Sequence, residues 1–298
     1  MNNIGIFIHI GNILLWDEIC SHINKIKDNK IFLFVNFCKD LISQIDIKDY
    51  KKIIKKEFPN SIFFENKNKG CDIGPFFLFL DYLRNNKIKM DWLIKIHTKS
   101  NKKWRTNLLK NLFPDNFNEM IKKLDDNEIP VHGAYPYPYD YFNIKYDLEN
   151  IKLLNLNVSK DWTTYTNNYP ETLNINVIEK RYHAQNVNKN YKFTPDIDLE
   201  LYNFLFGDQK EDHNIVEGKY KWSLINKIIG KDIKLYYFPG TFLLLKHEIL
   251  ENIFKDTDYE KIYNSLENQK LDDNIYQSNT HSWERILPIS FQLYKKYM

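Results

Sequence analysis

Ile4-Gly5-Ile6-Phe7-Ile8-His9-Ile10 is a short, continuous apolar run near the start of the chain, rich in residues that favour strands. A second such run lies at 31–37, after a segment in which four apolar residues recur at helical spacing (Leu15, Ile19, Ile23 and Ile26). Strands separated by helices are typical of βαβ units, whose parallel strands are joined by right-handed crossovers. The sequence therefore predicts an α/β fold with a doubly wound, mainly parallel sheet.

The alternation continues along the chain. Further strands are expected at 61–64, 91–97 and 129–134. One further helix is expected to bury the face formed by Tyr50, Ile53, Ile54 and Phe58, and another is expected from Pro75 to Leu83. Two strand-like runs between Asp232 and Leu245 are broken at Pro239-Gly240, a helix starts at Glu248, and Ser282–Tyr297 is an amphipathic closing helix that contains Pro288. The stretch 135–192 shows no clear boundaries. We expect one domain over residues 1–298 with a helical C-terminal appendage.

Composition limits the classes of protein to which the chain belongs. With 298 residues, 43% hydrophobic and 27% charged, it is long enough and apolar enough for a packed core. A net charge of +3 argues against a dedicated duplex nucleic-acid binder. The three scattered cysteines predict neither a disulfide framework nor a zinc cluster. No secretory signal and no apolar stretch of roughly 18 to 20 residues is found, so we expect a soluble, cytoplasmic protein with at most peripheral membrane association.

Lys95, His97 and Lys99 share one face of the predicted strand 91–97 and its extension, since side chains alternate with period two. A buried parallel strand is normally apolar on both faces, so these groups need partners. One interpretation is an edge strand with solvated lysines. The other is a cationic site, reinforced by Ser100, Lys102, Lys103 and Arg105, that holds a pyrophosphate.

An acidic residue, Asp72, lies in a turn between Gly70 and Gly74, shortly after Asn68. Flanking glycines allow positive φ angles and close backbone approach, so the carboxylate can be aimed into a site. The alternative is that Asp72 caps the helix that starts near Pro75. Both roles remain open at this stage.

Three further segments are candidates. Gly240-Thr241 is either a tight turn between strands or a backbone contact to a sugar. His281, Glu284 and Arg285 share a helical face, which fits surface ion pairing with capping by Asn279 or Thr280, or a catalytic role. His9 ends the first strand, where ligands of such sheets bind.

Together these segments resemble the rhamnan synthesis protein F family of bacterial polysaccharide glycosyltransferases. The resemblance follows the chain in order: His9, the stretch Asn68-x-Gly70-x-Asp72-Ile73-Gly74-Pro75-Phe76, Lys95-Ile96-His97-Thr98-Lys99-Ser100 with Trp104-Arg105, Gly240-Thr241-Phe242, and His281-Ser282-Trp283-Glu284-Arg285. Residues 135–235 contribute little to it. The common motifs of hydrolases, P-loop NTPases and dehydrogenases are missing.

The resemblance implies a GT-A-like fold and transfer of a sugar, rhamnose in the namesake, from a nucleoside-diphosphate donor to a glycan or lipid-linked glycan acceptor. Residues 1–135 would be the nucleotide-binding half and 136–298 the acceptor-side half. The donor would be bound by His9, Asn68, Gly70, Asp72, Lys95, His97, Lys99, Gly240 and Thr241. The metal-binding Asp-x-Asp of ordinary GT-A enzymes is replaced by Lys95-Ile96-His97-Thr98-Lys99, so fixed cations take the role of a divalent ion. No metal is expected, although His97 and Asp72 could together hold one.

The expected reaction is a single inverting displacement in which a carboxylate removes the proton of the acceptor hydroxyl. Glu284 is the leading base, with His281 one turn before it; Asp72 is the second choice, and Asp272 and Asp273 are outside candidates. Two other classes remain. One is a non-catalytic module that binds nucleotide sugars or glycans. The other is a nucleic-acid binder that uses Lys102, Lys103 and the tyrosines of 135–141.

Overall fold

A computed structural model of the chain describes residues 1–134, 136–138, 144–156, 236–268 and 278–297. Its centre is a six-stranded sheet of order β3-β2-β1-β4-β8-β5. The strands are β1 (Asn3–Ile10), β2 (Lys30–Cys38), β3 (Ile62–Asn66), β4 (Trp92–His97), β5 (Val131–Gly133) and β8 (Leu243–Lys246). Four neighbouring strands, β3, β2, β1 and β4, are parallel, and β8 runs antiparallel between β4 and β5. The predicted α/β class and the mainly parallel sheet are confirmed.

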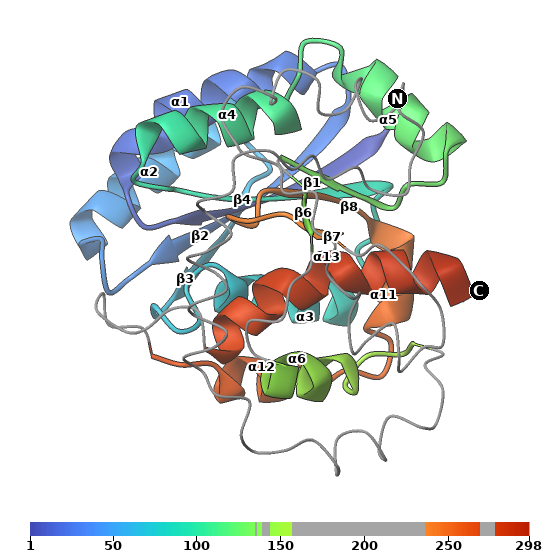
Figure 1. The fold of residues 1–298 in the computed structure, drawn as a ribbon. Coiled ribbons are helices and arrows are strands. Elements are labelled where there is room, and N and C mark those ends of the chain that lie inside the picture. Colours follow the sequence, from blue (N-terminus) through green and yellow to red (C-terminus); the bar gives the residue numbers. More distant parts are fainter. Residues whose placement is uncertain (135, 139–143, 157–235, 269–277, 298) are drawn as a thin grey trace.

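Helices cover both faces of this sheet (Figure 1). On the upper face lie α1 (Trp16–Ile23), α2 (Gln44–Glu57), α4 (Lys102–Leu112) and α5 (Phe117–Asp126). On the lower face lie α3 (Ile73–Asn85), α6 (Ile144–Ile151), α11 (His247–Ile253), α12 (Tyr259–Ser265) and α13 (Asn279–Tyr297). Two short strands form a second, antiparallel sheet: β6 (Tyr137–Pro138) and β7 (Tyr236–Tyr237). The C-terminal helices thus belong to the lower layer and do not form a separate appendage.

The order of the strands contains a switch point, at which the connections leaving neighbouring strands pass to opposite sides of the sheet. The connections β1-α1-β2 and β2-α2-β3 use helices of the upper face, whereas α3, which joins β3 to β4, lies on the lower face. Right-handed crossovers require this change of face, because β4 is on the opposite side of β1 from β2. Ligands of open α/β sheets bind at the carboxyl ends of the strands beside such a switch point. In this protein it lies between β1 and β4, where His9 and His97 are register partners.

One face of the sheet changes from aromatic to polar near these carboxyl ends. Phe7, Phe34 and Phe64 contact the ring of Phe79 in α3. Two residues further along each strand, and so on the same face, come His9, Asn36 and Asn66. The phenylalanines join α3 to the core, and the polar side chains end this aromatic layer at the switch point.

Several predicted elements differ in detail. The first predicted helix is α1 flanked by two short 3-10 turns, Ile13–Leu15 and Asn24–Ile26. The predicted buried face of α2 is wrong at Ile53, which is 45% exposed, because Ile47 and Ile54 are the residues that the helix buries. The two runs around Pro239-Gly240 do not form a hairpin: β7 pairs with β6, and β8 enters the main sheet. Residues 232–235 of the first run lie outside the described residues.

Candidate functional site

A buried ion pair lies beneath the carboxyl end of β4. The Lys95 ammonium is fully buried and donates hydrogen bonds to Asp72 Oδ2 and to Thr241 Oγ1, the latter at 2.8 Å. The Thr241 hydroxyl in turn donates to the same Asp72 oxygen. Because β4 lies inside the sheet, the interpretation of Lys95 as a solvated edge lysine is wrong. Its charge is neutralised within the protein, so in this structure Lys95 is not available to a diphosphate.

Asp72 precedes α3 but does not cap it, since its side chain makes no capping hydrogen bond and turns toward Lys95. Burial opposes its ionisation, yet the neighbouring Lys95 ammonium and the hydrogen bonds from Lys95 and Thr241 hold the pKa of Asp72 well below the usual range. Burial lowers the pKa of His97, so that ring is neutral near pH 7 and Lys95 supplies the compensating charge. A carboxylate this acidic is a poor proton acceptor, which argues against Asp72 as the catalytic base.

The Pro239-Gly240 turn brings backbone groups to the end of β4. The N–H of Thr241 bonds to the carbonyl of Phe238 at 3.3 Å, and Gly240 has φ +86°, a conformation that favours glycine. Its carbonyl lies 2.8 Å from His97 Nε2, and the His97 ring contacts Phe242 edge-on. The segment is therefore a tight turn that contacts His97, and its predicted backbone contact to a sugar stays a prediction.

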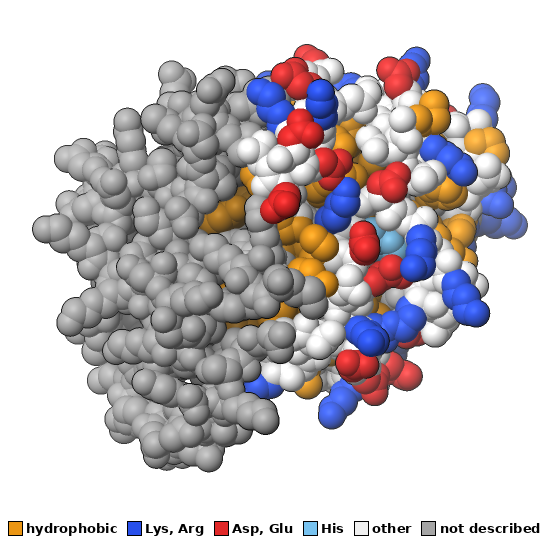
Figure 2. All heavy atoms as spheres, turned by 90° about the vertical axis from the view of Figure 1, so that its right-hand side faces the viewer, with side chains coloured by type: hydrophobic (Ala, Val, Ile, Leu, Met, Phe, Trp, Pro, Cys, Tyr) orange, Lys and Arg blue, Asp and Glu red, His pale blue; other side chains and the backbone are white. Residues whose placement is uncertain are grey.

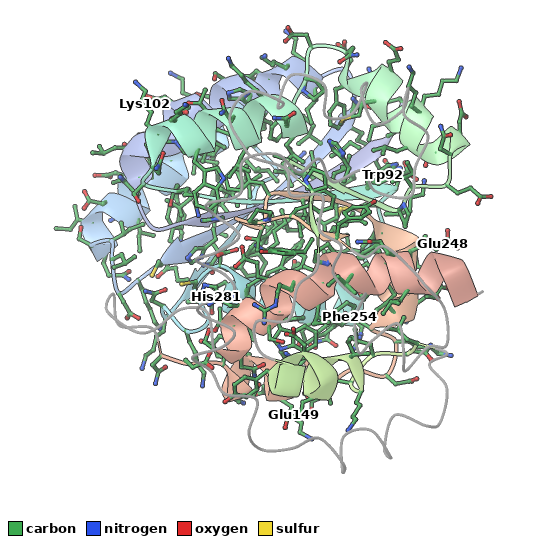
Figure 3. The ribbon with its side chains drawn as sticks, in the orientation of Figure 1. Trp92, Lys102, Glu149, Glu248, Phe254 and His281 are labelled. Atoms are coloured by element: carbon green, nitrogen blue, oxygen red, sulfur yellow. The ribbon has the colours of Figure 1, made fainter. Side chains whose placement is uncertain are left out.

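Glu284 reaches the same turn from the first part of α13. Its Oε1 accepts the Gly240 N–H at 2.6 Å, while Oε2 lies 4.0 Å from His281 Nε2. His281 Nδ1 is 2.8 Å from the Ser278 hydroxyl, and Figure 3 shows His281 at the start of α13 below the sheet. Burial lowers the pKa of His281, only partly offset by Glu284, so this ring is neutral near pH 7. Glu284 is thus a positioned, partly exposed carboxylate with one oxygen held by the backbone.

Surface ion pairing does not describe the neighbouring residues of α13. Arg285 is buried and pairs with Asp147 of α6, with Nη2 and Oδ1 2.9 Å apart. The first N–H groups of α13 are capped by Glu267, which accepts from residues 279 and 280, and by Ser278, which accepts from residue 281. Capping by Asn279 or Thr280 was therefore the wrong expectation. The capping carboxylate belongs to Glu267, 12 residues before Asn279 and outside the helix, where capping motifs do not place it.

Lys99 lies beyond the end of β4, not on the strand. Its ammonium lies 3.6 Å from the centre of the Trp104 ring, a cation–π contact. Burial lowers the pKa of Lys99, and the nearby carboxylates of Glu284 and Asp72 counteract this. Arg105 does not add a cation to the site, because its guanidinium is buried and paired with Glu18 at 2.7 Å. Lys99 is thus the partly exposed ammonium that remains beside Glu284 and Asp72.

The turn before α3 positions Asp72 through its backbone. Gly70 has φ +65° and donates its N–H to Glu267 at 2.9 Å, and a Cβ on Gly70 would lie 2.4 Å from a methyl carbon of Leu266. The N–H of Asn68 bonds to Asp40 at 2.7 Å. Burial raises the pKa of Cys71 to about 12, so its thiol stays protonated and is unsuited to nucleophilic attack. The structure brings the other predicted site residues together and places Asn68 and Gly70 in the supporting turn.

Asn36 and Asn66 are polar residues of this region that the sequence analysis missed. Asn66 donates to Asn36 at 2.6 Å, and the Asn36 amide nitrogen lies 2.8 Å from His9 Nδ1. A sequence signal existed: Asn36 is a lone amide in the apolar run Phe34-Val35-Asn36-Phe37-Cys38. An uncharged polar residue in a predicted buried strand requires a partner.

Four further features of the described residues bear on the predictions made from the sequence. In the described ranges no group of three or more His, Cys, Asp and Glu side chains is arranged to hold a metal ion. On the face shown in Figure 2, acidic and basic side chains are interspersed over the described part. None of the described helices is long and apolar enough to cross a membrane. Asp272 and Asp273, like the tyrosines at 139 and 141, lie outside the described residues.

Comparison with known proteins adds no relative: no family model, no curated protein and no solved structure matches the chain.

Proposed function

We propose that this chain is a glycosyltransferase that moves a sugar from a nucleoside-diphosphate donor to a glycan acceptor. The observation that carries the proposal is that the Gly240-Thr241 turn joins Glu284 and the Asp72–Lys95 pair at the switch point of the sheet, where both carboxylates act on the pKa of Lys99. A partly exposed ammonium, a positioned carboxylate and a buried acid together suit an anionic leaving group, an acceptor hydroxyl and sugar or ribose hydroxyls.

The reaction is a single inverting displacement. The acceptor oxygen forms a bond to the anomeric carbon while the bond from that carbon to the β-phosphate oxygen breaks, and the electron pair leaves with the nucleoside diphosphate. Glu284 Oε2 takes the acceptor proton, because Oε1 is held by the Gly240 N–H. Lys99 stabilises the negative charge on the leaving diphosphate. Asp72 is held by Lys95 and contacts hydroxyl groups of the donor.

The fold and the motif resemblance support this proposal. A parallel sheet with one antiparallel strand beside β4 is compatible with a GT-A-like domain. The resemblance to the rhamnan synthesis protein F family suggests rhamnose or another deoxyhexose, a glycan or lipid-linked glycan acceptor, and surface polysaccharide synthesis at the inner face of a membrane. Of the two lysines expected to bind the diphosphate, Lys95 is paired with Asp72. Without a divalent ion, Lys99 must therefore stabilise the leaving diphosphate without help from Lys95.

A non-catalytic module with the same fold is the second candidate. The observation that favours it is the internal neutralisation of Lys95, which leaves fewer cations for a leaving diphosphate. Such a module would bind the donor or the glycan through the same groups and would not cleave the donor.

Thermal-shift measurements with UDP, GDP and dTDP, followed by donor hydrolysis with the matching nucleotide sugars, test the proposal. A nucleoside diphosphate should stabilise the protein, and slow hydrolysis of a donor sugar separates the enzyme from the module. Lys102→Ala is a matched control for Lys99→Ala, because Lys102 is exposed at the start of α4 (Figure 3). Absence of stabilisation by every nucleotide would refute the transferase and a module that binds the donor, and would leave only a module that binds the glycan. Hydrolysis that stops with a chelator and returns with manganese would refute the metal-independent mechanism.

A further inference from the structure

Three polar side chains form a hydrogen-bonded row across the ends of three strands. Asn66 of β3 donates its amide to Asn36 Oδ1 of β2 at 2.6 Å, and the Asn36 amide nitrogen meets His9 Nδ1 of β1 at 2.8 Å. Asn36 is fully buried and His9 is 6% exposed. A buried amide without partners destabilises a protein, so these contacts constrain how each group is oriented.

The row has a direction. Since Asn36 Oδ1 accepts from Asn66, the Asn36 amide group is the side that faces His9, and it can only donate. His9 Nδ1 must then accept, which places the single proton of the neutral ring on Nε2. Burial lowers the pKa of His9 to about 4, with Asp72 opposing this and Lys95 adding to it, so the ring is neutral at pH 7.

The other ring nitrogen of His9, Nε2, is not the atom that meets Asn36. The described residues provide no hydrogen-bond partner for it, and it is not among the fully buried unpaired atoms. Its surroundings are close to electrically neutral, because Asp72 and Lys95 compensate each other and His97 is uncharged. A hydroxyl oxygen can accept a hydrogen bond from His9 Nε2–H in such neutral surroundings, whereas a phosphate group would need a cation beside it.

We infer that Asn36, held by Asn66, is a positioning residue that fixes His9 as the Nε2–H tautomer, so that His9 donates a hydrogen bond to a hydroxyl group of the bound donor. The ligand part of this inference rests on the proposed function. Two hydroxyl sources share this chemistry, the ribose and the transferred sugar. The tautomer part concerns the protein alone.

Nitrogen-15 NMR of the histidine rings tests the tautomer in the unliganded protein. His9 should show a protonated Nε2 and an unprotonated Nδ1 at pH 7, with the resonance assigned by its loss in His9→Gln. Asn36→Asp should move the proton to Nδ1, because a carboxylate can only accept. The control is Asn29→Asp, at a buried asparagine just before β2 at the opposite end of the sheet, and it should leave His9 unchanged. A wild-type Nδ1–H tautomer, or no change in Asn36→Asp, would overturn the inference.

Two substitutions of His9 test the ligand part without altering Asn36. The amide of His9→Gln extends to where Nε2 lies, whereas that of His9→Asn reaches only the Nδ1 position. His9→Asn should bind the stabilising nucleotide sugar about 5-fold more weakly and His9→Gln about as tightly as the wild type. If His9→Asn also weakens binding of the nucleoside diphosphate alone about 5-fold relative to His9→Gln, the hydroxyl group belongs to the ribose. If the difference is seen only with the sugar attached, the hydroxyl group belongs to the sugar. Equal affinities for both variants would overturn the ligand part. If no nucleotide binds, the proposed function and the ligand part fail together, while the NMR result still decides the tautomer.

Discussion

Removing one partner of the Lys95–Asp72 pair should destabilise the protein more than removing both. Asp72→Asn leaves a fully buried ammonium with only uncharged oxygens as partners, and Lys95→Met leaves a nearly buried carboxylate with only the Thr241 hydroxyl. Breaking a buried ion pair in this way costs about 3–5 kcal/mol. The double variant contains no unpaired charge, so its loss of stability should be smaller than that of either single variant. The expected coupling energy is therefore about 3 kcal/mol or more.

The assay is urea unfolding at pH 7 of the wild type, the two single variants and the double variant, with the free energy of unfolding extrapolated to water. Asp125→Asn is the matched control, since it breaks the partly exposed pair of Asp125 with Lys246, for which about 0–1 kcal/mol is expected. Single-variant losses below about 1 kcal/mol that add in the double variant would refute the buried pair. They would also restore Lys95 as a cation available to a ligand.

Three further predictions concern the site and its histidines. Glu284→Gln should lower kcat by about 10²–10⁴ while donor affinity stays within about 2-fold, measured by turnover and calorimetry; full activity would remove Glu284 from the base role. Lys99→Ala should lower kcat/KM for the donor by about 10- to 100-fold and Lys102→Ala by less than about 2-fold, and equal effects would contradict the assignment of Lys99. Burial lowers the pKa of His9 and His132 from 6.5 to about 4. Between these pH values the unfolded chain binds protons on both rings and the folded chain does not. The free energy of unfolding should therefore fall as the pH drops from 6.5 to 4, by up to about 3 kcal/mol for each ring. Urea unfolding at several pH values should show this loss reduced in His132→Gln, and an unchanged pH dependence would contradict it.

Local pattern was sufficient for the class of fold. The apolar runs at 4–10, 31–37 and 91–97 are strands, and their separation by helices made a mainly parallel sheet the expected arrangement. Period two also placed Lys95 and His97 on one face, and the position of both at a strand end located the site. These features depend on residues close in sequence, so the sequence alone determines them.

The state of each charge was decided only by tertiary structure. Lys95 is neutralised by Asp72, 23 residues away, and donates a hydrogen bond to Thr241, 146 residues away, so it could not be distinguished from a ligand-binding lysine by spacing. Asn36 and Asn66 became relevant only when the order of the strands placed them beside His9. Burial and pairing depend on contacts between distant segments, and the pKa and availability of a side chain follow from these contacts.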